Sequence, residues 1–427
     1  MARRALRIPR EKSSAFARRI RARLAGVAAC LAVAACIPPD VPVPDADGPL
    51  RLTQIGFAEL DGWRETPLIS ALDAFRRSCE IFIAKPDDAA LTGAGYGGAV
   101  SDWRLPCTRA VMVASGDAAA HAFFTSEFTP YRISEGDNTE GLFTGYYEPE
   151  LRGSLIRQGA YQTPLYALPD DLVSVDLGLF REALAGQRLA GRVEDGRLVP
   201  YAPRADIARN GLATAEPLVF IDDPADAFFL QVQGSGRIVL EDGRVLRAAY
   251  AGQNGHPYTA IGAVLIRRGA LTRENVSMQS IRAWLTAHPD EAPALLDENA
   301  SYVFFSLQPL DDPSQGPRGS QGVPLTAEAS IAVDTGRHPL GAPLWIETTA
   351  PASAETAPDE MFHRLLIAQD TGGAIRGSLR GDVFWGFGEA AGHIAGRMRG
   401  MGSMTVLLPN ALAARLGAHF DAGATPP

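Results

Sequence analysis

Short β-rich runs separated by turn residues constrain the fold of this 427-residue chain more than any other feature. In the second half of the chain, runs of four to seven residues rich in apolar side chains are separated by Gly, Pro and Asp. Helical spacing is clear only at 67–78 and at 276–297, where Pro289 interrupts it. The pattern predicts a mainly β fold, a barrel or sandwich with few helices. The predicted strands are 217–221, 228–233, 237–240, 302–306, 329–333, 344–348, 363–369 and 404–408.

The first 35 residues have the pattern of an export signal. Nine basic side chains and one acidic side chain lie within residues 1–23, and an apolar run from Leu24 to Ala35 follows. This run is too short for a permanent membrane span. It ends in small residues before Cys36, as in a bacterial lipobox, so we expect Cys36 to be lipidated. Ordinary signal-peptidase cleavage nearby is the alternative. Ile37 provides no aspartate signal for inner-membrane retention, so the expected location is the periplasmic face of the outer membrane.

Composition narrows the class of partner. Residues 36–50 are rich in proline and aspartate and predict an extended tether after the anchor. The formal net charge is −9, and removal of the basic signal would make the mature chain more acidic still. Such a chain is not suited to binding nucleic acid. Cys79 and Cys107 could form a disulfide in an oxidising compartment or remain two buried thiols, and the sequence leaves both open.

Several common catalytic designs are absent from the sequence. The seven histidines include no His-x-His or His-Glu-x-x-His pair, so a zinc hydrolase is disfavoured. There is no Gly-x-Ser-x-Gly motif for a serine nucleophile. The Gln-Gly-Ser-Gly segment at 233–236 lacks the lysine of a phosphate-binding loop, and predicts either a hairpin turn or a turn lining a sugar groove. We therefore expect no metal and no cofactor.

Three aspartates flanked by glycine near the C-terminus are the candidate chemical groups: Asp334, Asp370 and Asp382. Each taken alone would be read as a turn residue. They lie close together in the sequence and near Phe384, Trp385 and Phe387, and aromatic surroundings raise the pKa of a carboxyl group by desolvation. Aromatic faces beside acids also suit sugar rings. The pattern therefore indicates cleavage of a glycosidic bond.

Several separate sequence blocks are distinctive along nearly all of the mature chain. They are FTGYYEPEL at 143–151, YQTPLY at 161–166, FFLQVQGSGRI at 228–238, AGQNGHPYTAIG at 251–262, NASYVFF at 299–305, GVPLTAEASIAVD at 322–334, PLGAPLWI at 339–346, and QDTGGAIRG through AGHIAG at 369–396. Together these blocks resemble the membrane-bound lytic murein transglycosylase A family. The C-terminal blocks also resemble the three-aspartate domain that this family shares with other cell-wall proteins.

The resemblance implies a six-stranded double-psi β-barrel with an inserted, second β-rich domain and a substrate groove between the two. The expected organisation follows the chain in five parts. These are a signal peptide at 1–35, a lipidated tether at 36–50, the N-terminal part of the barrel at 51–147, an inserted glycan-binding domain at 148–314, and the C-terminal part of the barrel at 315–420.

The resemblance also implies the reaction: cleavage of the β-1,4 bond between N-acetylmuramic acid and N-acetylglucosamine, with formation of a 1,6-anhydro ring and without water. Asp382 matches the family's catalytic acid and base, and Asp370 would be a close supporting carboxylate or a turn cap. Tyr146 and Tyr147 could stack on sugars or be core residues. Gln231 and Gln233, on one face of a predicted strand, and Ser235 could bind substrate polar groups.

Two other functions fit the residues less well. A non-catalytic peptidoglycan-binding lipoprotein would keep the barrel without turnover, and an ordinary glycoside hydrolase would use water and two carboxylates. The expected partners are peptidoglycan glycan strands, the outer membrane through the anchor and, as a further option, cell-wall synthesis enzymes. Residues 350–359 predict a polar loop of unknown role.

Overall fold

The structure is a computed structural model. It describes residues 49–420 except 182–183, 185–187, 274, 311, 353–356 and 373–374. The predicted signal peptide, Cys36, nearly all of the tether and part of the 350–359 loop therefore lie outside the described residues.

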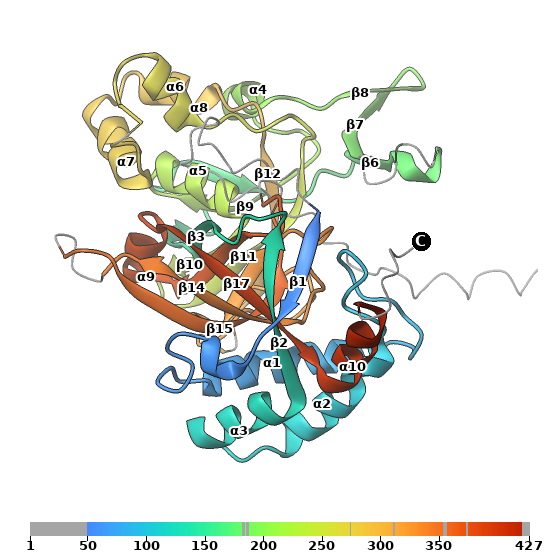
Figure 1. Cartoon of the computed structure of the whole chain (residues 1–427). Coiled ribbons are helices and arrows are strands. Elements are labelled where there is room, and N and C mark those ends of the chain that lie inside the picture. The colour runs from blue at the N-terminus through green and yellow to red at the C-terminus, as the bar shows by residue number, and fades with distance from the viewer. Residues whose placement is uncertain are drawn as a thin grey trace, which may run out of the picture.

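Six strands close into a barrel in the order β17-β14-β15-β13-β16-β3, with β17 pairing back to β3. Two further strands, β2 and then β1, extend the sheet from β17 (Figure 1). The neighbours β13 and β15 run parallel, as do β16 and β3. The mainly β, double-psi barrel prediction is confirmed. The bounds are β1 Leu50–Gln54, β2 Phe128–Glu135, β3 Gly141–Glu148, β13 Ser330–Val333, β14 Pro343–Ala350, β15 Glu360–Asp370, β16 Arg380–Phe387 and β17 Arg399–Pro409.

The barrel core is filled by alternate residues of these strands, because successive side chains of a strand point to opposite faces. Phe143, Trp345, Val383 and Val406 are fully buried there. The helices α1 (Ile69–Ile83), α2 (Val100–Met112), α3 (Asp117–Glu127) and α10 (Asn410–Phe420) lie together at one end of the molecule, at the bottom of Figure 1. The 67–78 helix prediction is confirmed by α1.

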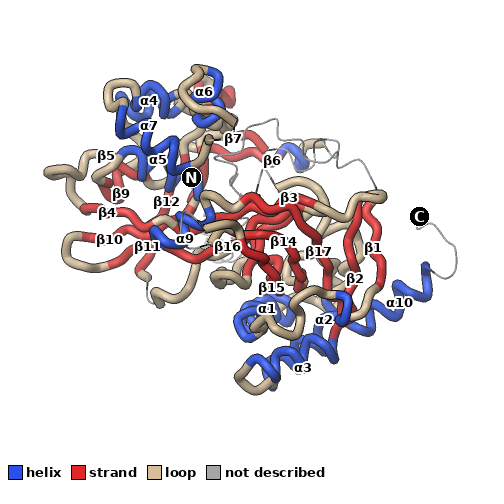
Figure 2. Tube along the Cα trace, turned by 60° about the vertical axis from the view of Figure 1, so that its left-hand side comes forward, coloured by secondary structure: helices blue, strands red, loops and turns tan. Residues whose placement is uncertain are grey.

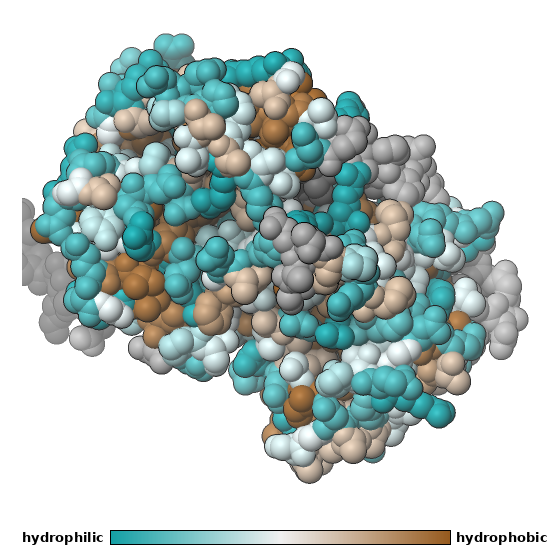
Figure 3. All heavy atoms as spheres, turned by 90° about the vertical axis from the view of Figure 1, so that its left-hand side faces the viewer, coloured by the Kyte–Doolittle hydropathy of each residue, from teal (hydrophilic) through white to brown (hydrophobic). Residues whose placement is uncertain are grey.

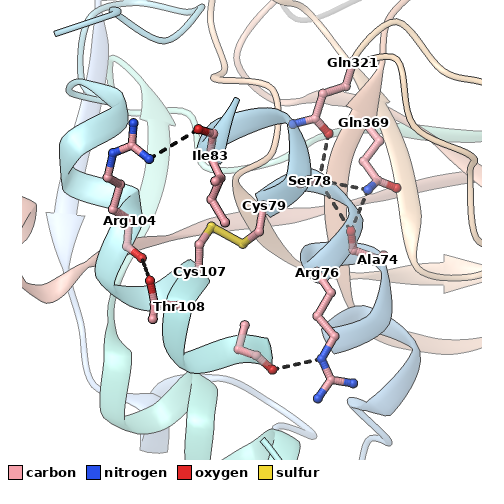
Figure 4. Close-up of a disulfide and its surroundings, with 11 residues drawn as sticks. Ala74, Arg76, Ser78, Cys79, Ile83, Arg104, Cys107, Thr108, Gln321 and Gln369 are labelled. Atoms are coloured by element: carbon pink, nitrogen blue, oxygen red, sulfur yellow. Dashed lines mark hydrogen bonds between the residues drawn. A yellow bond between two sulfur atoms is a disulfide. The ribbon is translucent and has the colours of Figure 1, made fainter. Parts of the chain in front are cut away.

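A disulfide joins α1 to α2 through Cys79 and Cys107 (Figure 4). Both cysteine side chains are buried in the large core cluster, so the bond links the two helices to each other within that core. The question that the sequence left open is answered in favour of the disulfide.

A second sheet of six strands has the order β12-β11-β10-β4-β9-β5 and lies beside the barrel (Figure 2). A smaller sheet, β6-β7-β8, projects from the same side. The strands are β4 Glu150–Ser154, β5 Thr163–Tyr166, β6 Val173–Asp176, β7 Arg188–Glu194, β8 Arg197–Pro200, β9 Pro217–Ile221, β10 Ser235–Leu240, β11 Val245–Gln253 and β12 Val303–Pro309.

Helices cover this second sheet and gather at the top of Figure 1. They are α4 Arg204–Asn210, α5 Pro224–Gln233, α6 Ile261–Arg267, α7 Met278–Ala287 and α8 Ala292–Asp297. The helical pattern at 276–297 is confirmed by α7 and α8, with Pro289 between them. The short α9, Gly388–Ala395, follows β16, and two 3-10 turns lie at Phe57–Glu59 and Leu177–Leu179.

Two sequence predictions about secondary structure are wrong. Residues 228–233 form the second half of α5 and not a strand, so Gln-Gly-Ser-Gly joins a helix to β10 and is no hairpin turn. The expectation of few helices also fails, since the described part of the chain contains ten α-helices. Phe228 and Phe229 are buried in α5, although the apolar run to which they belong was predicted as a strand.

The surface shows separate apolar patches within a mostly hydrophilic face (Figure 3). Within the residues that the structure describes, no helix has the length and apolar character needed to cross a membrane.

Candidate active site

Asp382 lies in the middle of β16 and is fully buried. Its register partners are Thr144 on β3 and Ala332 on β13, and Ala332 in turn pairs with Asp370 on β15. Strand alternation places Val383 in the barrel core, so Asp382 points to the opposite face. The barrel therefore brings the two predicted catalytic aspartates to one row across the sheet.

Both Asp382 contacts converge on one carboxylate oxygen. Thr144 Oγ1 donates to Asp382 Oδ1 over 2.5 Å, and Arg380 Nη1 donates to the same oxygen and forms an ion pair with it. Arg380 also donates from Nη2 to Thr144 Oγ1 over 2.9 Å, so the three side chains form a closed triangle. Asp382 Oδ2 is buried and has no hydrogen-bond partner among the described residues. One carboxylate oxygen is thus fixed by two side chains, and the other is buried without a partner in the described structure.

Arg380 and Thr144 were missed in the sequence. A signal for Arg380 existed, because residues two apart in a strand lie on the same face and Arg380 precedes Asp382 by two positions. Thr144 comes from a strand far away in the sequence, and its position beside Asp382 depends on the parallel pairing of β16 with β3.

Asp370 ends β15 and is held by a different set of groups. Its Oδ1 accepts from the backbone N–H of Ser320 over 2.9 Å and from Ser320 Oγ over 2.6 Å, and its Oδ2 accepts from the Tyr146 hydroxyl over 3.1 Å. Burial raises the pKa of Asp370 above its ordinary value, and the hydrogen bonds from Ser320 and Tyr146 work against this shift. The aromatic setting predicted a raised carboxyl pKa near these aspartates, and Asp370 has one.

The two aspartates do not touch within the described structure. β13 separates β15 from β16, so the two backbones lie roughly 9–10 Å apart. No hydrogen bond joins the two carboxyl groups in the part of the chain described. Any support that Asp370 gives to Asp382 must therefore act across Ala332 or through a bound substrate.

The two predicted stacking tyrosines face opposite sides of β3. Tyr146 is buried against Phe384, with ring centroids 5.3 Å apart, and its hydroxyl reaches Asp370. Tyr147 is buried in the cluster that includes α7 and α9, and its hydroxyl contacts Met278 Sδ at 3.7 Å. Tyr147 is therefore a core residue in this structure. Tyr146 also packs in the core, but its hydroxyl contacts Asp370.

The three polar residues predicted to bind substrate at 231–235 do not lie on one strand. Gln231 and Gln233 lie on helix α5 and not on a strand. Residues two apart on a helix point in nearly opposite directions, so the two side chains do not share one face. Gln231 lines a cavity of the second sheet's layer, and the Oε1 atoms of both glutamines have no partner among the described residues. Ser235 begins β10 and donates to Glu148 Oε1 at 3.5 Å.

A buried ion cluster at the joint between the two sheets was also missed. Glu148, the last residue of β3, is fully buried and binds Arg237 of β10 at 2.9 Å and Arg247 of β11 at 2.7 Å. Both arginines also donate to the backbone carbonyl of Gln315. Arg237 lies over the ring of Phe387, 3.3 Å from its centroid. The cluster ties the end of β16 to the second sheet.

Asp334 has the structural role that glycine flanks predict. Its Oδ1 accepts from Gly336 N and its Oδ2 from Gly377 N, which fixes the turn after β13. Among the described residues, no group of three or more His, Cys, Asp or Glu side chains is arranged to hold a metal ion.

The comparisons with known families agree on both parts of the chain. The model of the "MltA specific insert domain" matches residues 142–306, and the model of the "3D domain" matches residues 329–408. The fold and the family models together define a 3D-domain barrel protein that carries the MltA-type insert.

Membrane-bound lytic murein transglycosylase A of Escherichia coli strain K12 is 36% identical over 281 residues, covering 65% of this chain and 68% of the relative. The protein of that name from Vibrio cholerae is 33% identical over 299 residues, covering 68% and 71%. The crystal structure of MltA from Neisseria gonorrhoeae aligns with a TM-score of 0.73 and 32% identity over 88% of this chain and 97% of that one. E. coli MltA with bound chitohexaose aligns with a TM-score of 0.61, 27% identity and 85% and 95% coverage. The chain belongs to the membrane-bound lytic murein transglycosylase A family.

Proposed function

We propose that this protein is a peptidoglycan lytic transglycosylase that uses Asp382 as its acid and base. Family membership supports the reaction, and the chitohexaose bound to E. coli MltA supports a glycan strand as the substrate class. The observation that carries the residue assignment is the Asp382 environment: one oxygen is fixed by Arg380 and Thr144, and the other, Oδ2, is unpartnered. The peptidoglycan strand would lie in the groove predicted between the barrel and the inserted domain.

The proposed reaction breaks the bond between muramyl C1 and the glycosidic oxygen, and forms a bond between C1 and the muramyl C6 oxygen. A proton on Asp382 Oδ2 goes to the leaving oxygen, and the resulting carboxylate then accepts the proton of the C6 hydroxyl. No water is consumed, and the enzyme regains its starting protonation state. Arg380 and Thr144 would keep the carboxyl group in one orientation during both transfers. Because Asp382 is fully buried in this structure, glycan reaches Oδ2 only when the groups covering it move.

A specific observation favours Asp370 as a second candidate for the proton donor. Burial raises the pKa of Asp370, which favours its protonated form, while its two oxygens are held by Ser320 and Tyr146. In this version Asp382 would act as the base or stabilise developing positive charge at C1. The two assignments differ in which aspartate must carry a proton.

The first test is Asp382→Asn, with release of anhydromuropeptides from purified sacculi as the readout. Loss of the proton-transfer group should reduce the rate by about 10²–10⁴ or more, since general acid and base steps are each worth roughly this much. The variant should stay folded, because an amide oxygen can still accept from Arg380 and Thr144. A normally folded Asp382→Asn enzyme with wild-type turnover would rule out the assignment.

The matched variant is Asp370→Asn, which keeps an acceptor for Ser320 while removing the titratable group. If Asp382 is the only acid and base, this change should cost less than Asp382→Asn. If Asp370 is the proton donor, its loss should be at least as large and should remove the alkaline limb from the pH dependence of the remaining turnover, because a general acid is active only in its protonated form. The pH profiles of the two variants therefore separate the two assignments.

Product mass tests the two functions that compete with this one. Transglycosylation yields 1,6-anhydromuramic ends, whereas a water-using hydrolase yields reducing ends that are one water heavier. A binding protein yields neither. Mass spectrometry of digested sacculi should show anhydro ends, and their formation should persist in EDTA because the proposed steps use side-chain proton transfer alone. Activity that EDTA abolishes and zinc restores would contradict the metal-free mechanism.

We also propose attachment to the outer membrane through lipid on Cys36. The family name, membrane-bound, supports association with the envelope. Wild type should incorporate labelled fatty acid and fractionate with outer membrane, and Cys36→Ser should do neither. Recovery of the wild type as a soluble periplasmic protein would refute the anchor. Complexes with cell-wall synthesis enzymes remain an expectation from the sequence resemblance.

A further inference from the structure

A cavity inside the inserted domain has the features of a binding site separate from the aspartate row. Its volume is about 610 Å³, within the range of small-molecule sites. All of its walls come from residues between 162 and 302, on β5, α4, α5, α7, α8 and neighbouring loops. Aromatic and aliphatic side chains form much of the lining, with Tyr166, Phe228, Leu285 and Tyr302 among them.

A buried cation lies in this lining. Arg204 is 6% exposed, and its guanidinium carbon lies 4.7 Å from the ring centroid of Phe228 and 5.2 Å from that of Tyr302. Its Nε donates to the carbonyl of Asn299 and its Nη2 to that of Ser301. These contacts hold the side chain in place and leave Nη1 without a hydrogen-bond partner in the described part of the chain. Burial lowers the pKa of Arg204 to about 10, so it remains charged at neutral pH.

An unpaired carboxylate lies in the same lining. Asp297, at the end of α8, is half-buried and has no hydrogen bond or ion pair with any other described residue. Arg204 is close enough to influence its pKa, yet the two side chains form no ion pair. Other charged groups of the cavity are engaged locally: Arg209 pairs with Asp206, and Asp223 caps α5 by accepting from Ala225 N. Among the charged lining residues that the structure describes, Asp297 is the carboxylate with neither a hydrogen bond nor an ion pair, and Arg204 keeps Nη1 for a ligand.

A third polar group adds to this pattern. Gln231 is 4% exposed and lines the cavity next to Arg204, and its Oε1 has no partner among the described residues. Tyr302, which also lines the cavity, donates its hydroxyl to the carbonyl of Pro164 at 3.3 Å. A buried oxygen without a partner, such as Gln231 Oε1, favours a ligand that brings N–H donors.

We propose that this cavity binds the zwitterionic α-amino acid group of a cell-wall peptide, with its carboxylate on Arg204 and its ammonium on Asp297. A simple anion would leave Asp297 unpaired beside it, and a simple cation would face Arg204. A zwitterion satisfies both groups at once, and its apolar part contacts the aromatic walls. The peptide source rests on the proposed function, because peptidoglycan carries peptides on the glycan, and a diamino acid in such a peptide presents a free α-amino acid end.

The test measures dissociation constants for the full mature chain by ligand-observed NMR. Leucine is the zwitterionic probe, N-acetyl-leucine lacks the ammonium, and leucinamide lacks the carboxylate. Each modified probe should bind about 10- to 100-fold more weakly than leucine, the range that corresponds to losing one charge-assisted hydrogen bond. Asp297→Asn should weaken leucine binding by a similar factor and leave N-acetyl-leucine unchanged. Glu298→Gln, a change at the neighbouring exposed carboxylate that pairs with Arg268, should leave all three constants unchanged.

A second pair of probes identifies the source of the ligand. A cell-wall disaccharide tetrapeptide containing a diamino acid should bind with the same dependence on Asp297, and the disaccharide without peptide should not. Binding of leucine alone would support the site with a free amino acid as occupant. The inference is overturned if leucine does not bind, or if Asp297→Asn and N-acetylation both leave its affinity unchanged. Because no bond is cleaved in this assay, its failure is independent of the Asp382 assignment.

Discussion

At the scale of single residues, His338 is the group whose burial has the clearest consequence for stability. It is fully buried, and its ring nitrogens contact the Tyr96 hydroxyl at 2.7 Å and the Ser378 carbonyl at 2.8 Å. Since a carbonyl only accepts, Nε2 carries the proton and Nδ1 accepts from Tyr96. Burial lowers the pKa of His338 from 6.5 to about 4.

This lowered pKa predicts acid sensitivity with a defined sign. The unfolded chain takes up the His338 proton near pH 6.5 and the folded chain only near pH 4, so stability falls as the pH drops between these values. The loss should approach roughly 3 kcal/mol across the window. Urea denaturation at pH 4.5 and 7.5 should show a smaller difference for His338→Gln than for wild type. The raised pKa of Asp370 makes stability rise as the pH drops, but this contribution is the same in wild type and in His338→Gln. Equal pH dependence of unfolding in the two proteins would therefore contradict the prediction.

The sequence located the candidate aspartates but not their environments. Gly flanks and neighbouring aromatic residues were enough to single out Asp370 and Asp382, and resemblance to a family assigned their roles. The ion pair with Arg380 and the contact with Thr144 depend on strand register, which a local pattern does not contain. For the same reason the carboxyl groups were expected close together, whereas β13 lies between their strands.

At the scale of elements, α5 shows why 228–233 was misread. The run of Phe, Leu and Val favours a strand by composition, and its spacing was read without its flanks. The flanks mark a helix: the Asp223 side chain accepts from Ala225 N, Pro224 occupies the first turn, and Gly234 ends the helix with a φ of 77°. These capping residues are visible in the sequence. Nothing local, by contrast, shows that helices lie against the barrel, because that packing joins distant segments.

The disulfide between α1 and α2 predicts a measurable contribution to stability. It closes a loop with a sequence separation of 28, for which loop-closure entropy gives about 3–4 kcal/mol. Cys79→Ala with Cys107→Ala should lower the free energy of unfolding by this amount. Wild type unfolded in excess reductant should match the double variant, and oxidised wild type unfolding at the same denaturant concentration as the double variant would contradict the prediction.

The same helix supports the end of β15, so loosening α1 should also affect the aspartate row. Ser78, next to Cys79, donates to Gln321 Oε1 at 2.7 Å and accepts from Gln369 Nε2 at 2.9 Å, as Figure 4 shows. Gln321 and Gln369 adjoin Ser320 and Asp370 in the chain. At a temperature where the double cysteine variant is still folded, its glycan-cleavage rate should therefore fall less than that of Asp382→Asn, since only the support is weakened. A loss as large as that of Asp382→Asn would show that the disulfide matters to the chemistry itself.

At the scale of the whole molecule, the chain leaves the barrel sheet after Glu148 and enters the second sheet at Glu150. It passes the same point on its return at Gln315, whose carbonyl accepts from Arg237 and Arg247. The Glu148 cluster therefore joins both crossings between the two sheets. The sequence placed the domain boundaries at 147/148 and 314/315 by resemblance, and that division remains a prediction. The ion cluster contains Glu148 and the carbonyl of Gln315, which lie at these two predicted boundaries.

Removing the acid from this cluster should destabilise the molecule as a whole. Glu148→Gln keeps the shape of the side chain but leaves Arg237, which is 2% exposed, without its charged partner. Breaking a buried ion pair on one side commonly costs about 3–5 kcal/mol, because the remaining charge stays desolvated. Denaturant unfolding followed by tryptophan fluorescence should show this loss. Asp242→Asn, which removes an exposed acid paired with Arg244 on the same side of the molecule, should leave the midpoint unchanged. Equal midpoints for Glu148→Gln and wild type would mean that the two sheets hold together without the cluster.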